Sequence, residues 1–153
     1  MPTLGVISDT HGLLRPEAAA ALRGVDRILH AGDIGKPEIL AELARIAPVT
    51  AVRGNNDQVP WARAIKDTAM LDIAGHRILV LHDLAELDID PAAEGIAAVI
   101  SGHSHKPKSE RRDGVLFLNP GSAGPRRFKL PVSLALLRIS ARKMLTKIIE
   151  LKV

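Results

Sequence analysis

The sequence predicts a protein of the α/β class, a four-layer α/β/β/α sandwich of two mixed sheets with flanking helices. Three observations predict this class. Strand-like and helix-like segments alternate over the first third of the chain, paired apolar segments follow, and 46% of the 153 residues are hydrophobic. A chain of this length matches one ordinary domain with its own core, so we expect a single domain spanning residues 1–153.

Three strands joined by two helices are predicted in the first third of the chain. The helix predicted at residues 16–23 has proline at its start and Gly24 just past its end. The helix predicted at residues 36–47 has apolar residues at helical spacing and stops before Pro48. The strands are apolar, β-branched segments at residues 3–8, 26–30 and 49–53. This β-α-β-α-β order implies a parallel sheet with right-handed crossovers.

Hairpins and short strands are predicted in the rest of the chain. Two apolar segments flank Gly75 and His76, where we expect a hairpin turn, and a second hairpin turns around residues 140–143. The predicted strands lie at residues 69–74, 77–82, 97–101, 115–118, 132–139 and 144–151. We therefore expect this part to be mostly antiparallel and to complete the two sheets.

Charge and composition disfavour several classes of function. The net charge of +4 favours anionic partners, but the basic residues are scattered, and the clusters at 106–108 with 111–112 and at 126–129 suit a solvated surface. Only 2% of residues are aromatic, and no helix-turn-helix, zinc-finger or aromatic-basic motif is present, so nucleic acid is expected only as a substrate. The chain has no Cys, so a metal would be held by His, Asp, Glu, Asn or backbone oxygen.

The chain starts directly with a strand-like segment. It shows no basic stretch followed by a long apolar one, and no apolar run is long enough to span a membrane. We therefore expect a cytoplasmic protein with no membrane partner. The apolar composition is also compatible with a homodimer.

Side chains of metal-binding type recur where predicted strands end. The carboxyl ends of parallel strands share one edge of an open sheet, and ligands bind there. Residues far apart in sequence would converge at that edge, and so many buried polar groups would be costly without an ion. The residues are Asp9, His11, Asp33, Asn55, His82, His103 and His105.

The residue types at these positions suit a divalent metal. Carboxylate, imidazole and amide oxygen form a mixed nitrogen and oxygen set that fits Mn, Fe, Zn or Ni. The Asp9–His11 and His103–His105 pairs each have one residue between them, so in an extended segment both side chains lie on one face. Each pair can therefore serve one metal or two neighbouring ones.

Five fragments in this order resemble the motifs of the calcineurin-like metallophosphoesterase superfamily, most of all its small single-domain bacterial and archaeal phosphodiesterase branch. They are Asp9-Thr10-His11, Gly32-Asp33, Gly54-Asn55-Asn56-Asp57, His82 and Gly102-His103-Ser104-His105. The resemblance implies the metallophosphoesterase fold and two divalent metal ions, with manganese among the candidates. It implies a first metal held by Asp9, His11 and His105, a second held by Asn55, His82 and His103, and Asp33 as the bridge. A water or hydroxide that bridges the metals would attack phosphorus.

Three further residues are candidates for catalysis. Asn56 stands where many members of the superfamily have His, and an amide cannot act as a general acid near neutral pH, so good leaving groups should react best. Asp57 would chiefly orient the Asn55 loop, and Arg126 in the late Pro-Arg segment would face the phosphate. Asp83 stands where the family commonly has Gly, and its carboxylate would either support His82 or repel substrate.

The resemblance implies a metal-dependent phosphodiesterase or phosphatase that acts on a small phosphate ester. The alternative is a weakly active or inactive protein-interaction scaffold, because the superfamily fold includes the vacuolar sorting retromer subunit, which is chiefly an assembly platform. An inactive site should have lost a ligand, whereas all seven ligand positions here carry a usable side chain. The sequence therefore favours the enzyme and leaves open its substrate, its metals and its oligomeric state.

Overall fold

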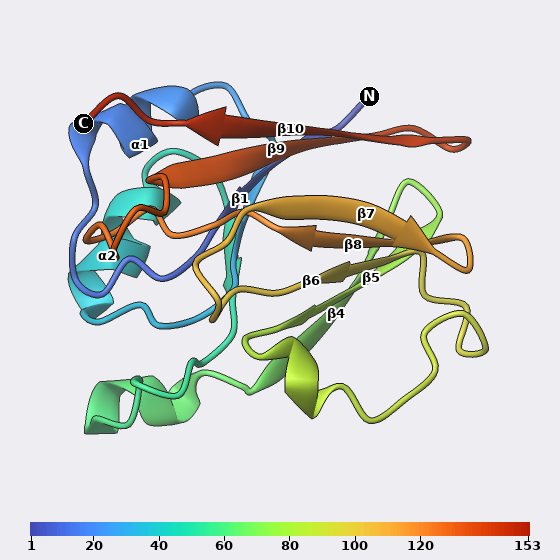
Figure 1. Ribbon diagram of the computed structural model, residues 1–153, viewed down its shortest axis with the longest axis horizontal. Helices are drawn as coiled ribbons and strands as arrows, with labels where there is room; N and C mark the ends of the chain where they lie inside the picture. The colour runs from blue at the N-terminus through green and yellow to red at the C-terminus, as the bar shows by residue number, and fades with distance from the viewer.

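Two five-stranded sheets lie face to face in the computed structural model, which describes residues 1–153 (Figure 1). The first sheet has the strand order β10-β9-β1-β2-β3, and the second has the order β4-β5-β6-β8-β7. The strands of the first sheet are β1 (Thr3–Ile7), β2 (Arg27–His30), β3 (Val49–Ala51), β9 (Ser133–Ile139) and β10 (Met144–Glu150). The strands of the second sheet are β4 (Thr68–Ile73), β5 (His76–Leu81), β6 (Ala98–Ile100), β7 (Lys108–Arg112) and β8 (Val115–Asn119).

Both sheets are mixed, as predicted. In the first sheet β1, β2 and β3 run parallel, and β9 and β10 add antiparallel pairs. In the second sheet β5, β6 and β8 run parallel, and β4 and β7 pair antiparallel at the two edges. This second sheet is less antiparallel than predicted. The irregular segment 83–96, rather than a tight turn, leads from β5 to β6, and the chain forms the edge strand β7 before β8 returns beside β6.

The two α-helices lie in the crossovers of the first sheet. They are α1 (Pro16–Ala21) and α2 (Pro37–Ala44), each with proline in its first turn, where a missing N–H costs nothing. Leu22 and Leu43 pack with Ile7 and Ile28 on the outer face of this sheet. Two short 3₁₀ helices, η1 (Pro60–Ala64) and η2 (Leu84–Glu86), complete the set. None of these helices has both the length and the apolar character needed to cross a membrane.

Successive side chains of a strand point to opposite faces of the sheet, which divides the apolar residues between the space between the sheets and their outer faces. On β5, Ile78 and Val80 point between the sheets, where they pack with Leu29 and other residues of the largest core cluster. Leu79 and Leu81 of the same strand point to the outer face and join a separate cluster. A period of two thus buries both faces of the central strands.

The outer layer over the second sheet is thin. It consists of η2 and the irregular segment 83–96, whose Leu84, Leu87 and Ile96 pack on outward residues of β5 and its neighbours. No α-helix covers this face, in contrast to the first sheet. The outward side chains at the β7 and β8 edge are therefore left close to solvent.

Two tight turns set the hairpins of the second sheet. Ala74 and Gly75 connect β4 to β5 with φ of 51° and 83°, and Asp113 and Gly114 connect β7 to β8 with φ of 53° and 78°. Positive φ at both central residues is typical of the two-residue hairpin turn whose twist matches that of the two strands it joins. His76, predicted within the first turn, already pairs with Ile73. The polar strand β7 was not predicted, because it has no apolar face.

We expect Leu29→Ala to lower the free energy of unfolding by about 2–5 kcal/mol, because Leu29 is fully buried between the sheets. Urea denaturation measures the change. Leu145→Ala is the matched control, since Leu145 on β10 is 47% exposed and its loss should cost less than about 0.5 kcal/mol. Equal effects of the two substitutions would contradict this assignment of the core.

Candidate metal centre

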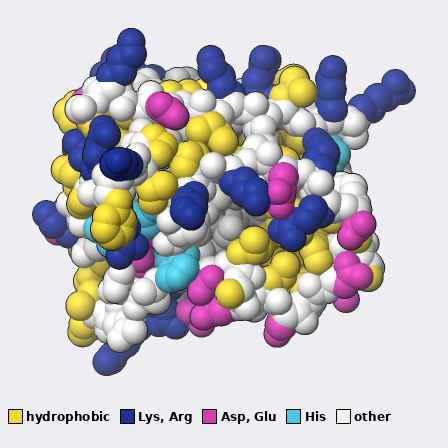
Figure 2. Space-filling view, in the orientation of Figure 1, with side chains coloured by type: hydrophobic (Ala, Val, Ile, Leu, Met, Phe, Trp, Pro, Cys, Tyr) yellow, Lys and Arg dark blue, Asp and Glu magenta, His cyan; other side chains and the backbone are white.

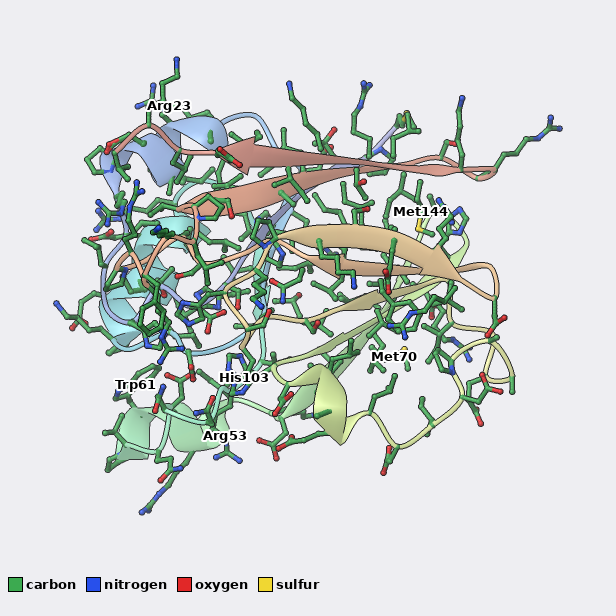
Figure 3. All side chains as sticks on the ribbon, viewed as in Figure 1. Arg23, Arg53, Trp61, Met70, His103 and Met144 are labelled. Carbon is green, nitrogen blue, oxygen red and sulfur yellow. The ribbon has the colours of Figure 1, made fainter.

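The loops that leave the carboxyl ends of five strands meet at one edge of the two sheets. They follow β1, β2 and β3 of the first sheet and β5 and β6 of the second. Figure 3 shows His103 among these loops, where the two sheets come together. The seven predicted ligands sit on them: Asp9 and His11 after β1, Asp33 after β2, Asn55 after β3, His82 after β5, and His103 and His105 after β6.

One buried oxygen of Asp9 marks the centre of the site. Its Oδ1 accepts no hydrogen bond although the side chain is fully buried. Three imidazole Nε2 atoms lie around it, that of His105 at 3.3 Å, that of His11 at 3.8 Å and that of His82 at 3.9 Å. The other oxygen accepts from Ser8 Oγ at 2.6 Å and from the His103 N–H at 3.1 Å. An unsatisfied buried carboxylate oxygen is costly, so this arrangement fits a bound cation.

Two overlapping groups of side chains have the spacing of metal ligands. Asp9, His11 and His105 form the first group, and Asp9, Asp33 and His82 form the second, with ligand atoms within 4.8 Å of one another in each. Asn55 and His103 are the remaining predicted ligands. They lie together at the rim, with Asn55 Oδ1 3.3 Å from His103 Nδ1. The seven residues predicted from sequence thus come together.

The ring of His82 is oriented as a metal ligand needs. Its Nδ1 donates to the Ala31 carbonyl at 2.7 Å, so Nε2 is left facing Asp33 Oδ2 at 3.3 Å, without good hydrogen-bond geometry. Burial by itself lowers the pKa of His82. The Asp33 carboxylate, the Ala31 carbonyl and Asp9 outweigh burial and raise that pKa to about 9.

Asp33 is held in its ionised form. Its Oδ1 accepts from the Asn56 N–H at 2.9 Å, and its Oδ2 accepts from Asn56 Nδ2 at 3.1 Å. Burial raises the pKa of Asp33, but His82, the Asn56 N–H and His11 outweigh it and lower the pKa to about 2. The Asn56 amide therefore orients this carboxylate.

Asp57 holds two of the site's loops together. Its buried carboxylate accepts from the backbone N–H groups of Ile34, Gly35 and Gly54, at 3.0–3.1 Å. These donors belong to the loop that carries Asp33 and the loop that carries Asn55. This is the orienting role that the sequence favoured for Asp57.

His30 joins the loop that carries Asp9 and His11 to the loop that carries Asp33. Thr10 Oγ1 donates its single proton to the Ile34 carbonyl at 2.8 Å, so the 3.0 Å contact with His30 Nε2 must be donated by the ring. His30 Nδ1 accepts from the Gly32 N–H at 3.1 Å. Burial and the neighbouring His82 lower the pKa of His30 to about 3, so the ring stays neutral.

The backbone around the site is strained. Only eight non-glycine residues have positive φ, and five of them are candidate ligands: Asp9, His11, Asp33, His103 and His105. Such conformations persist where surrounding contacts enforce them, and they gather at functional sites. The loops also pack closely against one another. A Cβ on Gly54 would collide with Asp33, and a Cβ on Gly102 would collide with Ser8.

A polar cavity of about 310 Å³ opens over the ligands. Arg126, predicted from sequence, lines it together with its neighbour Arg127, which the sequence reasoning missed although the Arg-Arg run was visible. No hydrophobic residue lines this cavity. Two guanidinium groups beside the candidate ligands suit a small, strongly anionic group such as phosphate.

Asp83 lies differently from what its sequence position suggested. Asp83 faces His103, with Oδ2 3.7 Å from Nε2, rather than His82, and its Oδ1 accepts the Ala85 N–H at the start of η2. Arg53 pairs with Asp67 at 2.9 Å.

Comparisons with known proteins show what the chain as a whole is similar to. Residues 3–142 match the family model described as the calcineurin-like phosphoesterase superfamily domain. A probable metallophosphoesterase of Methanothermobacter thermautotrophicus is 37% identical over 159 residues, covering 96% of this chain and 91% of that protein. A phosphodiesterase of Methanocaldococcus jannaschii is 27% identical over 137 residues, covering 77% and 82%.

A solved structure shares the fold at lower identity. Vacuolar Protein Sorting 29 from Cryptosporidium parvum superposes with a TM-score of 0.84, covering 99% of this chain and 92% of that chain at 20% identity. Likeness at this level concerns the arrangement of the chain and not its activity.

We expect the stabilising contribution of His82 in chelator-treated protein to disappear at high pH. The folded-state pKa of about 9 lies above the ordinary histidine pKa of 6.5, so the contribution is complete below pH 6.5 and is lost as pH rises through about 9. Urea unfolding of the chelator-treated protein and of His82→Gln between pH ~6 and ~9 measures it. The difference in unfolding free energy should shrink with pH, and a difference independent of pH would contradict the pairing of His82 with Asp33.

Proposed function

The chain belongs to the calcineurin-like phosphoesterase superfamily, and from this premise we propose that it hydrolyses small phosphodiesters with two divalent metal ions. The match and the metallophosphoesterase relatives establish a phosphoesterase family. The choice of a diester draws on the phosphodiesterase relative of M. jannaschii. One observation carries the rest of the proposal: the unpaired, buried Asp9 oxygen with three imidazole nitrogens around it.

The donor set fits divalent metals. Asp9 Oδ1 and His82 Nε2 are buried without a hydrogen-bond partner, which a coordinated cation would correct. Nitrogen and oxygen donors without thiolate favour Mn, Fe, Zn or Ni over softer metals. We assign Asp9, His11 and His105 to one metal, Asn55, His82 and His103 to the other, and Asp33 to a position between them.

Bound metals of this kind supply a water with a lowered pKa as nucleophile, and they offset the charge of the phosphate. The chain's own residues prepare that chemistry. The pKa of Asp33 is about 2, so its carboxylate is ionised near neutral pH. The Ala31 carbonyl fixes the orientation of the His82 ring. Arg126 and Arg127 line the polar cavity and would grip the non-reacting phosphate oxygens.

Proton donation to the leaving group is the weak point of this site. Asn56 stands in the cavity but donates to Asp33, and its amide has no acidic proton to give near neutral pH. With no acid at position 56, we expect the departing oxygen to take its proton from solvent. Esters with good leaving groups should react fastest.

We expect Asp33→Asn to lower kcat/KM by more than ~10²-fold, because loss of a residue that only supports a metal ligand costs ~10–100-fold. The assay follows bis(4-nitrophenyl) phosphate and 4-nitrophenyl phosphate with chelator-treated protein and added Mn, Ni, Zn or Mg. Asp72→Asn is the control, since Asp72 is an exposed acid on β4 and should leave the rate unchanged.

Either of two outcomes would contradict this proposal. Turnover of Asp33→Asn close to that of the unmodified protein would remove Asp33 from the metal centre. Metal binding without turnover of either ester would favour the protein-interaction scaffold, whose fold the chain shares.

We expect Asn56→His to raise the rate on esters with poor leaving groups relative to good ones, by at least ~10-fold, because imidazolium can act as a general acid. Alkyl and 4-nitrophenyl diesters provide the comparison. Asn56→Gln is the control, since it retains an amide and should not change the ratio. An unchanged ratio in Asn56→His would show that protonation of the leaving group does not limit the reaction.

A further inference from the structure

A second cavity of about 290 Å³ begins at His103 and runs over the outer face of β7 and β8. It shares His103 with the metal-centre cavity, so the two cavities are neighbours on either side of this residue. It exists because no α-helix covers this side of the second sheet. Figure 2 shows this face, with a histidine to one side and a row of basic side chains, interrupted by an acidic one, above it.

The cavity has a fixed shape at the end nearest the metal centre. Asn119 Nδ2 donates to the Gly102 carbonyl at 2.9 Å and to Ser104 Oγ at 3.1 Å. Ser104 Oγ also accepts from the Lys106 N–H at 3.2 Å. The loop that carries His103 is thus tied to the end of β8, and the backbone of Lys106 is held beside it.

The two basic side chains along the far wall pair with the same glutamate. Alternate residues of β7 face outward, and Glu110 pairs with Lys108 at 3.2 Å and with Arg112 at 2.9 Å. The Arg112 guanidinium also lies over the Phe117 ring, 4.2 Å from its centroid. Both basic side chains of this wall are engaged by one carboxylate, and the three residues together keep a net charge of +1.

Lys106 is the exception. It lines the cavity next to His103 and makes no ion pair. The other carboxylate in the lining, Asp83, faces His103 and holds the first turn of η2. The lining holds three basic and two acidic side chains, so its net charge is +1, and Lys106 is the unpaired basic residue at the end that lies by the metal centre.

We propose that this cavity binds one ester substituent of the phosphodiester substrate, and that this substituent carries its own negative charge, which Lys106 pairs. The proposal rests on the proposed function. Hydrolysis adds water across the ester, so that the bond from phosphorus to the leaving oxygen breaks, a bond to the water oxygen forms, and a monoester and an alcohol result. The charged substituent stays in the second cavity while this bond is exchanged at the metal centre.

A pair of symmetrical diesters tests the assignment. Bis(4-nitrophenyl) phosphate has uncharged ester groups, whereas bis(3-carboxy-4-nitrophenyl) phosphate carries a carboxylate on both, so the charge reaches the cavity whichever group leaves. We expect the unmodified protein to favour the carboxylated diester by ~5-fold in kcat/KM, as for an exposed ion pair. Raising salt from ~0.05 M to ~0.5 M should reduce this preference, because the pair is screened.

Substitution of Lys106 should change the ratio of kcat/KM for the carboxylated diester to that for the uncharged diester, and not only the two rates together. Lys106→Gln should bring the ratio of the two kcat/KM values close to one, and Lys106→Arg should restore most of the preference. Lys143→Gln is the matched control, since Lys143 is an exposed lysine in the link between β9 and β10 and should leave both rates unchanged.

The outcomes separate the two proposals. If neither diester is hydrolysed with any metal, the proposed function fails. If both are hydrolysed but the carboxylated one is not preferred, or the preference survives in Lys106→Gln, the metal centre stands and the second cavity is not a substituent site.

Discussion

The arrangement of this chain depends on two buried carboxylates that share one small space. Asp9 is fully buried and Asp33 nearly so, and both approach the ring of His82. Two buried anions this close repel, so every nearby contact serves to hold them in place. Asn56 and the His103 N–H donate to them directly, while Asp57 and His30 fix the loops on which they sit. The strained backbone of the ligands follows from the same constraint.

Much of the first sheet could be predicted from sequence, because its signals are local. Proline and glycine mark the ends of both helices, and apolar runs mark β1 and β2. The seven candidate ligands could be found for a related reason, since each directly follows such a run. β7 could not be found in this way: its residues, from Lys108 to Arg112, are all polar, and only pairing with β8 makes them a strand.

Other features of the site depend on tertiary contacts that no local pattern reveals. The position of Asp83 beside His103 rather than His82 is set by the turn into η2. The second cavity exists because no α-helix covers the outer face of the second sheet. The sequence predicted helices flanking the sandwich and did not indicate that this face would lack one. The fold, which Vacuolar Protein Sorting 29 shares, is compatible with many activities, so the activity has to be inferred from the residues of the site.

The candidate ligands are divided between the two sheets, with Asp33 supplied by one and His82 by the other. A cation held there would join the halves of the sandwich and bind only the folded chain, which adds about 2.7 kcal/mol of stability at a free metal concentration one hundred times Kd. Cellular proteases remove chains in proportion to their unfolded fraction. The abundance of this protein would then rise and fall with the metal supply of the cell, even where the concentration of its substrate stays constant.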